Sequence, residues 1–131
     1  TTLEKVLFLK SIPLFATLHG ETLAQIAPIA QEVRCGVGEC FIRAGERGDC
    51  LYVVVDGEVD VRSSEDTIAT AESRSIIGEL AVLAHRPRNT DCVALTDLLL
   101  LRIDKEDFWA LLEERPELST GVLRQIIDRY V

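Results

Sequence analysis

The sequence has no apolar run long enough to cross a membrane. Its uninterrupted apolar runs are short, such as Leu98–Leu101, whereas a membrane-spanning helix requires roughly 20 consecutive apolar residues. Residues 1–10 also lack the charged start, apolar stretch and small-residue cleavage site of a secretory signal. We therefore predict that this chain does not insert into a membrane.

Cysteine and histidine are too sparse and too scattered to predict a metal site. Cys35, Cys40, Cys50 and Cys92 form no CxxC pair, and neither of the 2 histidines follows them at metal-ligand spacing. A 131-residue chain with 47% apolar residues can form a core without disulfides. We predict reduced thiols, no metal, and a location in the cytoplasm or at the cytoplasmic face of a larger protein.

Basic residues are in deficit, with 14 Lys plus Arg against 22 Asp plus Glu and a net charge of -8. An acidic chain repels nucleic-acid phosphates and anionic lipid surfaces, so we predict no direct nucleic-acid binding. Pairs for nucleophilic catalysis are also lacking, because no serine or cysteine has a histidine partner at a suitable local spacing. An enzyme is the weakest interpretation, and we predict a non-enzyme.

Apolar residues recur at helical spacing near both ends of the chain, which predicts short packing helices there. In the N-terminal part they are Leu3, Val6, Leu7, Leu23, Ile26 and Ile29. In the C-terminal part they are Phe108, Leu111, Leu112, Leu118, Val122, Leu123, Ile126 and Ile127. Asp104 is suited to cap the first C-terminal helix, and Pro116 is suited to begin the second.

The central part of the sequence alternates between apolar and polar residues, which predicts strands. Residues 39–45, 50–57 and 58–66 each end at a glycine or a polar turn, residues 67–72 continue the pattern, and residues 92–103 return to it. We predict an antiparallel meander that closes into a barrel. Because the sequence lacks repeats and linkers, we predict one domain over residues 1–131, excised from a longer protein since it starts without methionine.

The segment GELAVLAHRPRNT, residues 78–90, combines groups that suit a phosphate. If a helical turn follows Gly78, its first amide groups favour an anion. Gly78 lets the main chain approach closely, Pro87 fixes the turn, and Arg88 offers a planar fork that matches two phosphate oxygens. Glu79 can accept a proton from a sugar hydroxyl. Each residue alone also fits an ordinary helix start or a solvated turn, but together they match the phosphate and ribose of a nucleotide.

Three stretches occur in a specific order: GECFIRAGERGDCLYVVVDGEVDV, then IIGELAVLAHRPRNTDCVALTD, then LLLRIDKEDFWALLEERPEL. In this order they resemble the cyclic nucleotide-binding domain family of catabolite-activator-type regulators, kinase regulatory subunits and gated channels. The resemblance covers nearly the whole chain, with Gly38, Gly45, Gly48 and Gly57 at the family's glycines. It implies an α+β fold that is mainly β: an antiparallel β-roll, or jelly-roll barrel, with flanking N-terminal and C-terminal helices.

The resemblance also implies a ligand-binding site within residues 78–90, which we call the cassette. Its implied residues are Gly78, Glu79, Leu80, Ala81, Arg88, Asn89 and Thr90. In this family's pattern, Glu79 would accept the ribose 2′-hydroxyl and Arg88 would pair with the cyclic phosphate. No cofactor besides the nucleotide ligand, cAMP or cGMP, is implied.

The sequence departs from the family's pattern at two positions. Arg74 stands where the family has a glycine, and Asp91 stands where a threonine or serine follows the two small residues. A carboxylate at position 91 would oppose a phosphate ligand or pair with Arg88 in its place.

Three non-enzymatic functions remain open. The first is a regulatory module that senses a cyclic nucleotide and relays its occupancy through the last helix to an attached effector domain. The second is a structural or interaction module of the same fold, with an empty pocket or another anion. The third is a fragment of a transcription regulator, whose DNA-binding part would follow residue 131. A second copy of the chain, forming a homodimer, is a further candidate partner.

Overall fold

The computed structural model describes residues 2–16, 18–64 and 66–130. The chain divides into two compact units. One unit is Gln31–Lys105 and contains most of the strands, while the other consists of Thr1–Ala30 together with Glu106–Val131 and is mainly helical. That the whole chain is a single domain stays a prediction.

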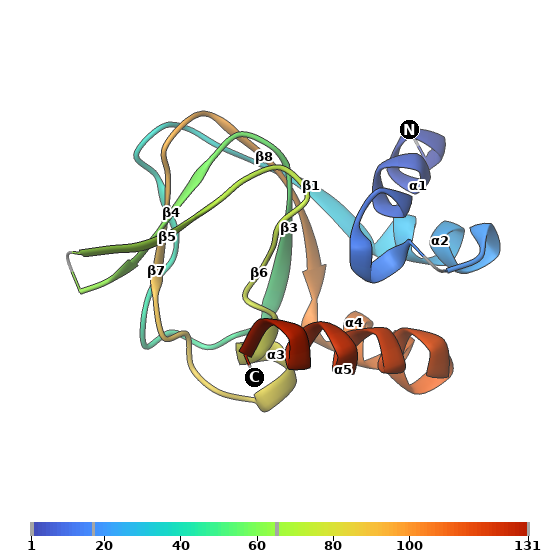
Figure 1. The fold of residues 1–131 in the computed structure, drawn as a ribbon. Helices are drawn as coiled ribbons and strands as arrows, with labels where there is room; N and C mark the ends of the chain where they lie inside the picture. The colour runs from blue at the N-terminus through green and yellow to red at the C-terminus, as the bar shows by residue number, and fades with distance from the viewer. Residues whose placement is uncertain (1, 17, 65, 131) are drawn as a thin grey trace. The chain divides into compact units, whose positions relative to one another are not determined.

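Two four-stranded sheets make up the unit Gln31–Lys105 (Figure 1). The first sheet has the order β1-β8-β3-β6, with bounds β1 Ala30–Cys35, β8 Leu98–Asp104, β3 Cys50–Asp56 and β6 Ile76–Ile77. The second has the order β2-β7-β4-β5, with bounds β2 Cys40–Ile42, β7 Asp91–Ala94, β4 Val59–Ser63 and β5 Asp66–Ala71. The mainly antiparallel β-roll predicted from the sequence is confirmed.

The predicted meander is wrong, because consecutive strands rarely pair with each other. Strand β3 pairs with β6 and β8, whereas the next strand, β4, belongs to the other sheet and pairs with β5 and β7. Alternation marks which residues form strands, but it does not say which strand lies beside which. The two residues of β6 are too few to show any alternation, and the sequence did not predict this strand.

The interior of the roll is an apolar cluster to which both sheets contribute. Its buried members are Cys35, Ile42, Cys50, Tyr52, Val54, Val59, Ala71, Ile77, Cys92, Ala94, Leu98 and Leu100. Phe41 and Tyr52 join the sheets through an edge-to-face ring contact, with centroids 5.2 Å apart. Burial raises the pKa of Tyr52 to about 12 and that of Cys92 to about 11. Both side chains are therefore neutral at pH 7, as an apolar interior requires.

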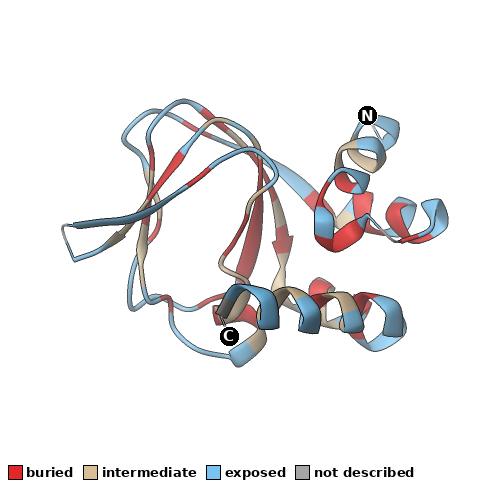
Figure 2. Ribbon diagram, in the orientation of Figure 1, coloured by how far each residue is buried: buried red, intermediate tan, exposed pale blue. Residues whose placement is uncertain are grey.

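Exposure differs sharply between strands of the roll. Figure 2 shows β3 mostly as buried, whereas β5 is mostly exposed. Strand β5 pairs with β4 at the edge of its sheet, and its apolar Ile68 is 58% exposed. The cluster therefore lies between the sheets near β3, and the outer part of the β4–β5 hairpin contributes little to it.

Four α-helices and two short 3-10 helices account for the other unit, with α4 starting at the boundary residue Lys105. Their bounds are α1 Thr2–Lys10, η1 Pro13–Phe15, α2 Gly20–Ile26, η2 Ala27–Ile29, α4 Lys105–Glu114 and α5 Pro116–Tyr130. The predicted apolar stripe of α4, Phe108, Leu111 and Leu112, is buried, as are Leu118 and Val122 of α5. None of the described helices is both long and apolar enough to span a membrane.

Parts of two predicted apolar faces are exposed where burial was expected. Leu3 and Leu7 of α1 are 67% and 61% exposed, and Leu9 is the buried residue of that helix. The inward face of α1 also carries Lys5, whose Nζ donates a hydrogen bond to the carbonyl of Ala30 at 2.8 Å. Lys5 and Leu9 are four residues apart and share this helix face. Leu123 and Ile127 of α5 are likewise exposed.

Arg74 adopts a left-handed backbone conformation, with φ 74°, in the turn before β6. Such a conformation costs an L-residue roughly 1–2 kcal/mol, and glycine avoids this cost. We therefore expect the free energy of unfolding of Arg74→Gly to be about 1 kcal/mol higher than that of Arg74→Ala. The alanine variant is the reference because it removes the same side-chain contacts but keeps Cβ. Urea denaturation of both variants measures the difference. A glycine variant less stable than the alanine variant would contradict the inference that the backbone at position 74 is strained.

Candidate functional site

The cassette connects β6 of one sheet to β7 of the other. Gly78 follows β6 with φ 86° and ψ 8°, a left-handed conformation that turns the chain out of the strand and into α3, Glu79–Ala84. The sequence of α3, ELAVLA, consists mainly of good helix formers, and His85 ends the helix in a second left-handed conformation. The predicted helical turn after Gly78 is therefore present.

Arg88 returns to the start of α3 and is only 8% exposed. Its Nη1 donates a hydrogen bond to the carbonyl oxygen of Gly78 at 3.1 Å, and its Nη2 donates one to the carbonyl oxygen of Cys50 in β3 at 2.5 Å. A side chain at position 78 would overlap Nη1, so the guanidinium occupies the space that glycine leaves open. The structure thus joins both ends of the cassette to β3.

The charge of Arg88 has no anionic partner among the residues that the structure describes. Its guanidinium instead hydrogen bonds to neutral main-chain carbonyls. Burying a cation costs several kcal/mol unless an anion compensates, because the interior solvates charge poorly. The site therefore holds a buried positive charge that an anionic ligand would neutralise.

Asp91 does not supply the compensating charge. Its Oδ1 accepts a hydrogen bond from the backbone N–H of Ala44 at 2.7 Å. The expected pairing of Asp91 with Arg88 is therefore wrong. Asp91 begins β7 and lies opposite Arg62 of β4, whereas Arg88 lies in the connection before the strand, so spacing of three residues does not bring the two side chains together.

A second segment, Arg43–Cys50, lies along the cassette, and we call it the bracing segment. The N–H of Gly45 donates to the carbonyl of Arg88 at 2.8 Å, and the N–H of Arg88 donates to the carbonyl of Glu46 at 2.7 Å. The next residue, Arg47, forms an isolated antiparallel bridge with Pro87. The main chain of Arg88 is therefore held on both its N–H and its C=O.

The bracing segment also contacts α3 directly. A Cβ at Gly48 would overlap the Cβ of Ala81, so the absence of a side chain at position 48 allows the close approach. Ala81 is accordingly buried, at 8% exposure, whereas Glu79 and Leu80 on the same helix are half-buried. Short side chains at this crossing set the distance between α3 and the bracing segment.

The structure joins some of the predicted site residues but not all of them. Gly78, Ala81 and Arg88 share one network with the bracing segment. Asn89 is exposed, and Thr90 is half-buried and does not share this network of described residues. Sequence reasoning missed the bracing segment as part of the site, although the glycines Gly45 and Gly48 pointed to a place where backbones approach closely.

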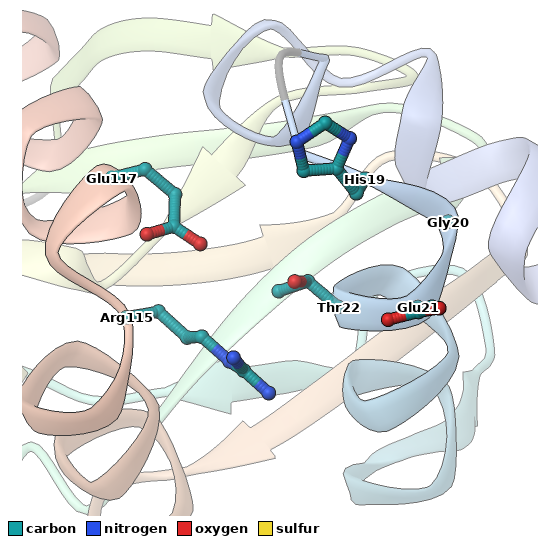
Figure 3. Close-up of a pocket in the computed structure, with 6 residues that line it drawn as sticks. All are labelled: His19, Gly20, Glu21, Thr22, Arg115 and Glu117. Atoms are coloured by element: carbon teal, nitrogen blue, oxygen red, sulfur yellow. The ribbon is translucent and has the colours of Figure 1, made fainter.

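The helical unit contains a separate hollow of about 570 Å³ (Figure 3). Its lining residues are His19, Gly20, Glu21, Thr22, Arg115 and Glu117. Arg115 Nη2 donates a hydrogen bond to Gln25 Oε1, while its Nε is buried and has no partner among the described residues. The lining thus contains two carboxylates, one guanidinium and one imidazole, and none of the predicted site residues contributes to it.

Comparison with known proteins identifies similar sequences. The family described as cyclic nucleotide-binding domain matches residues 32–115. A cAMP-dependent protein kinase regulatory subunit of Aspergillus niger is 30% identical over 107 residues, which cover 80% of this chain and 26% of that protein. A cGMP-dependent protein kinase of Caenorhabditis briggsae is 33% identical over 91 residues, which cover 70% of this chain and 12% of the kinase. The chain thus spans a minor part of both relatives.

A solved structure agrees with these sequence matches. It is the N-terminal domain of a transcriptional regulator from Streptomyces coelicolor A3(2), with 34% sequence identity and a TM-score of 0.78. The match covers 93% of this chain and 91% of that domain.

Proposed function

The chain belongs to the cyclic nucleotide-binding domain family, and from this premise we propose that it is a regulatory module that binds cAMP or cGMP in the cassette. The single observation that carries the proposal is Arg88, whose buried guanidinium hydrogen bonds only to neutral groups among the described residues: two main-chain carbonyls and the Cys50 sulfur. A cyclic phosphate is an anion with two free oxygens, which suits both the charge and the fork of this side chain. The function is ligand sensing rather than catalysis.

We assign the other cassette residues to the remaining parts of the nucleotide. Glu79, the first residue of α3, accepts the ribose 2′-hydroxyl, and the main chain of Gly78–Ala81 lies beside the phosphate. Asn89 and Thr90 follow Arg88 and contact the ligand from the entrance to β7. These assignments rest on the order of the residues around Arg88 and on the family's pattern.

Occupancy of the cassette is then relayed to an effector domain through α5. The lengths of the relatives support an attached domain in the full-length protein, because both kinase proteins extend far beyond the region that matches this chain. Four free thiols, Cys35, Cys40, Cys50 and Cys92, support a reducing location such as the cytoplasm. A homodimer is a second candidate assembly, and sedimentation with and without nucleotide tests it.

Calorimetric titration with cAMP, cGMP and AMP tests the proposed function. We expect saturable binding of at least one cyclic nucleotide and much weaker binding of AMP. The phosphate of AMP carries an additional charge and is not closed into the cyclic 3′,5′-diester. Absence of binding for both cyclic nucleotides would instead support a structural module of the same fold.

The sugar contact gives a narrower prediction. If Glu79 accepts the 2′-hydroxyl, then 2′-deoxy-cAMP binds about tenfold more weakly than cAMP, because a hydrogen bond to a charged group is lost. Glu79→Gln should narrow this difference, since a neutral amide holds the hydroxyl less strongly. Titration of both proteins with both ligands measures the two ratios. Equal affinity of the wild type for the two ligands would remove Glu79 from the site.

A further inference from the structure

Asp91 forms a hydrogen bond whose place in the network suggests a function. The half-buried side chain lies at the first residue of β7, and its Oδ1 accepts from the N–H of Ala44 at 2.7 Å. A bond from an N–H to an ionised carboxylate is stronger than one to a neutral acceptor. This contact ties the start of the bracing segment to the strand that follows the cassette.

The bond continues a row of contacts between the same two segments. Ala44 is held by Asp91, Gly45 is held by the carbonyl of Arg88, and Glu46 accepts from the N–H of Arg88. Three consecutive residues of the bracing segment are thus bound by residues 88–91. The Asp91 bond is the only one of the three that a side chain makes, so substitution can remove it without altering the main chain.

The two neighbouring arginines, Arg62 and Arg88, hydrogen bond to other groups and not to the Asp91 carboxylate. Arg62 lies opposite Asp91 across the β4–β7 pair, but its Nε donates to Asp60 Oδ2 at 2.6 Å. Arg88 donates to the carbonyls of Gly78 and Cys50. Within the described residues, Asp91 therefore forms no ion pair with either cation.

We propose that Asp91 is a positioning residue for the phosphate-binding Arg88. Its carboxylate fixes the bracing segment, the bracing segment fixes the main chain of Arg88, and the guanidinium is thereby kept at the carbonyls of Gly78 and Cys50. The inference rests on the proposed function for its ligand. It replaces the idea that the carboxylate at position 91 competes with the phosphate.

Asp97 provides a matched control in the same unit. Its Oδ1 accepts a hydrogen bond from the N–H of Val37 at 3.2 Å, which is the same type of contact, after the other end of β7. The contacts of Arg88 do not include Val37 or Asp97. Loss of the Asp97 bond therefore reports the general effect of removing a carboxylate-to-backbone bond from the roll.

The binding test compares Asp91→Ala, Asp91→Asn and Asp97→Ala by calorimetric titration with cAMP. We expect Asp91→Ala to bind about fivefold more weakly than the wild type, because one hydrogen bond that orders the site is lost. Asp91→Asn retains a carbonyl oxygen for Ala44 and should bind within about twofold of the wild type, as should Asp97→Ala. Wild-type affinity in Asp91→Ala, or an equal loss in Asp97→Ala, would overturn the proposal.

A second measurement does not depend on any nucleotide. Hydrogen exchange of the Gly45 and Arg88 amides in the ligand-free proteins should be faster in Asp91→Ala than in the wild type and unchanged in Asp97→Ala. If the wild type binds no cyclic nucleotide, the proposed function fails and this measurement alone decides the positioning function. Unchanged exchange at both amides in a folded Asp91→Ala variant would overturn it.

Discussion

Replacement of Arg88 by leucine is expected to lower the affinity for cAMP by about 30-fold or more, because truncating one partner of a buried charge pair costs roughly 2–5 kcal/mol. Arg88→Lys keeps the charge but loses the planar fork, and we expect a loss of about tenfold. The affinity should therefore fall from the wild type to the lysine variant to the leucine variant. The first step measures the effect of the planar geometry, and the second measures the effect of the charge. Calorimetric titration gives all three affinities.

Arg86→Leu is the matched control for this series. Arg86 lies two residues before Arg88 and carries the same charge, but it is exposed. Its loss should change the affinity by no more than about twofold, as expected for an exposed charge that long-range attraction alone connects to the ligand. Far-ultraviolet circular dichroism checks that each variant is folded. If Arg86→Leu and Arg88→Leu lower the affinity equally, the nucleotide is attracted by the overall positive charge of this segment and not by a specific contact with Arg88.

The second large effect is expected for Gly78→Ala, which should lower the free energy of unfolding by about 3 kcal/mol or more. The left-handed backbone conformation at φ 86° accounts for roughly 1–2 kcal/mol of this loss. The remainder arises because the new Cβ overlaps Arg88 Nη1. The guanidinium must then move, and its hydrogen bonds to the carbonyls of Gly78 and Cys50 are lost. The affinity for cAMP should fall with it.

Gly38→Ala separates these two contributions. Gly38 has nearly the same backbone angle, φ 85°, but a Cβ there meets no atom within 4 Å. This variant should show only the loss of roughly 1–2 kcal/mol that the backbone conformation causes, with cAMP binding unchanged. Urea denaturation of both variants measures the difference, and equal losses would mean that Arg88 accommodates the methyl group without cost.

The motifs in the sequence predicted the local structure of the cassette better than its contacts with distant segments. The pattern from Gly78 to Arg88 indicated a helical turn after Gly78, and the structure has this helix, with Arg88 hydrogen bonded to Gly78. These features follow from local rules, since only glycine adopts the left-handed conformation freely and ELAVLA favours a helix. Strands β3, β4, β5, β7 and β8 were predicted for a similar reason, because alternation is also a local property.

Contacts between distant segments could not be predicted in the same way. The bond between Asp91 and Ala44, and the one between Arg88 and the carbonyl of Cys50, depend on which strands pair. Sequence spacing placed Asp91 near Arg88 because they are close along the chain. In the structure Asp91 begins β7 and Arg88 lies in the connection before it, and the two side chains have different partners. The exposed Leu3 and Leu7 illustrate the same difficulty, because the inward face of α1 includes the contact of Lys5 with the distant carbonyl of Ala30.

The order of the strands also affects how the protein folds. Cys40 pairs with Val93, and Cys50 pairs with Asp104, so each sheet is completed by a strand made long after its partner. Closing such long loops costs entropy before any contact compensates for it, and chains dominated by distant pairs fold slowly. During synthesis, the bracing segment leaves the ribosome well before the cassette that satisfies its hydrogen bonds. The network around Arg88 therefore cannot form until the chain has been made as far as Asp91, which is 47 residues after Ala44 in the bracing segment.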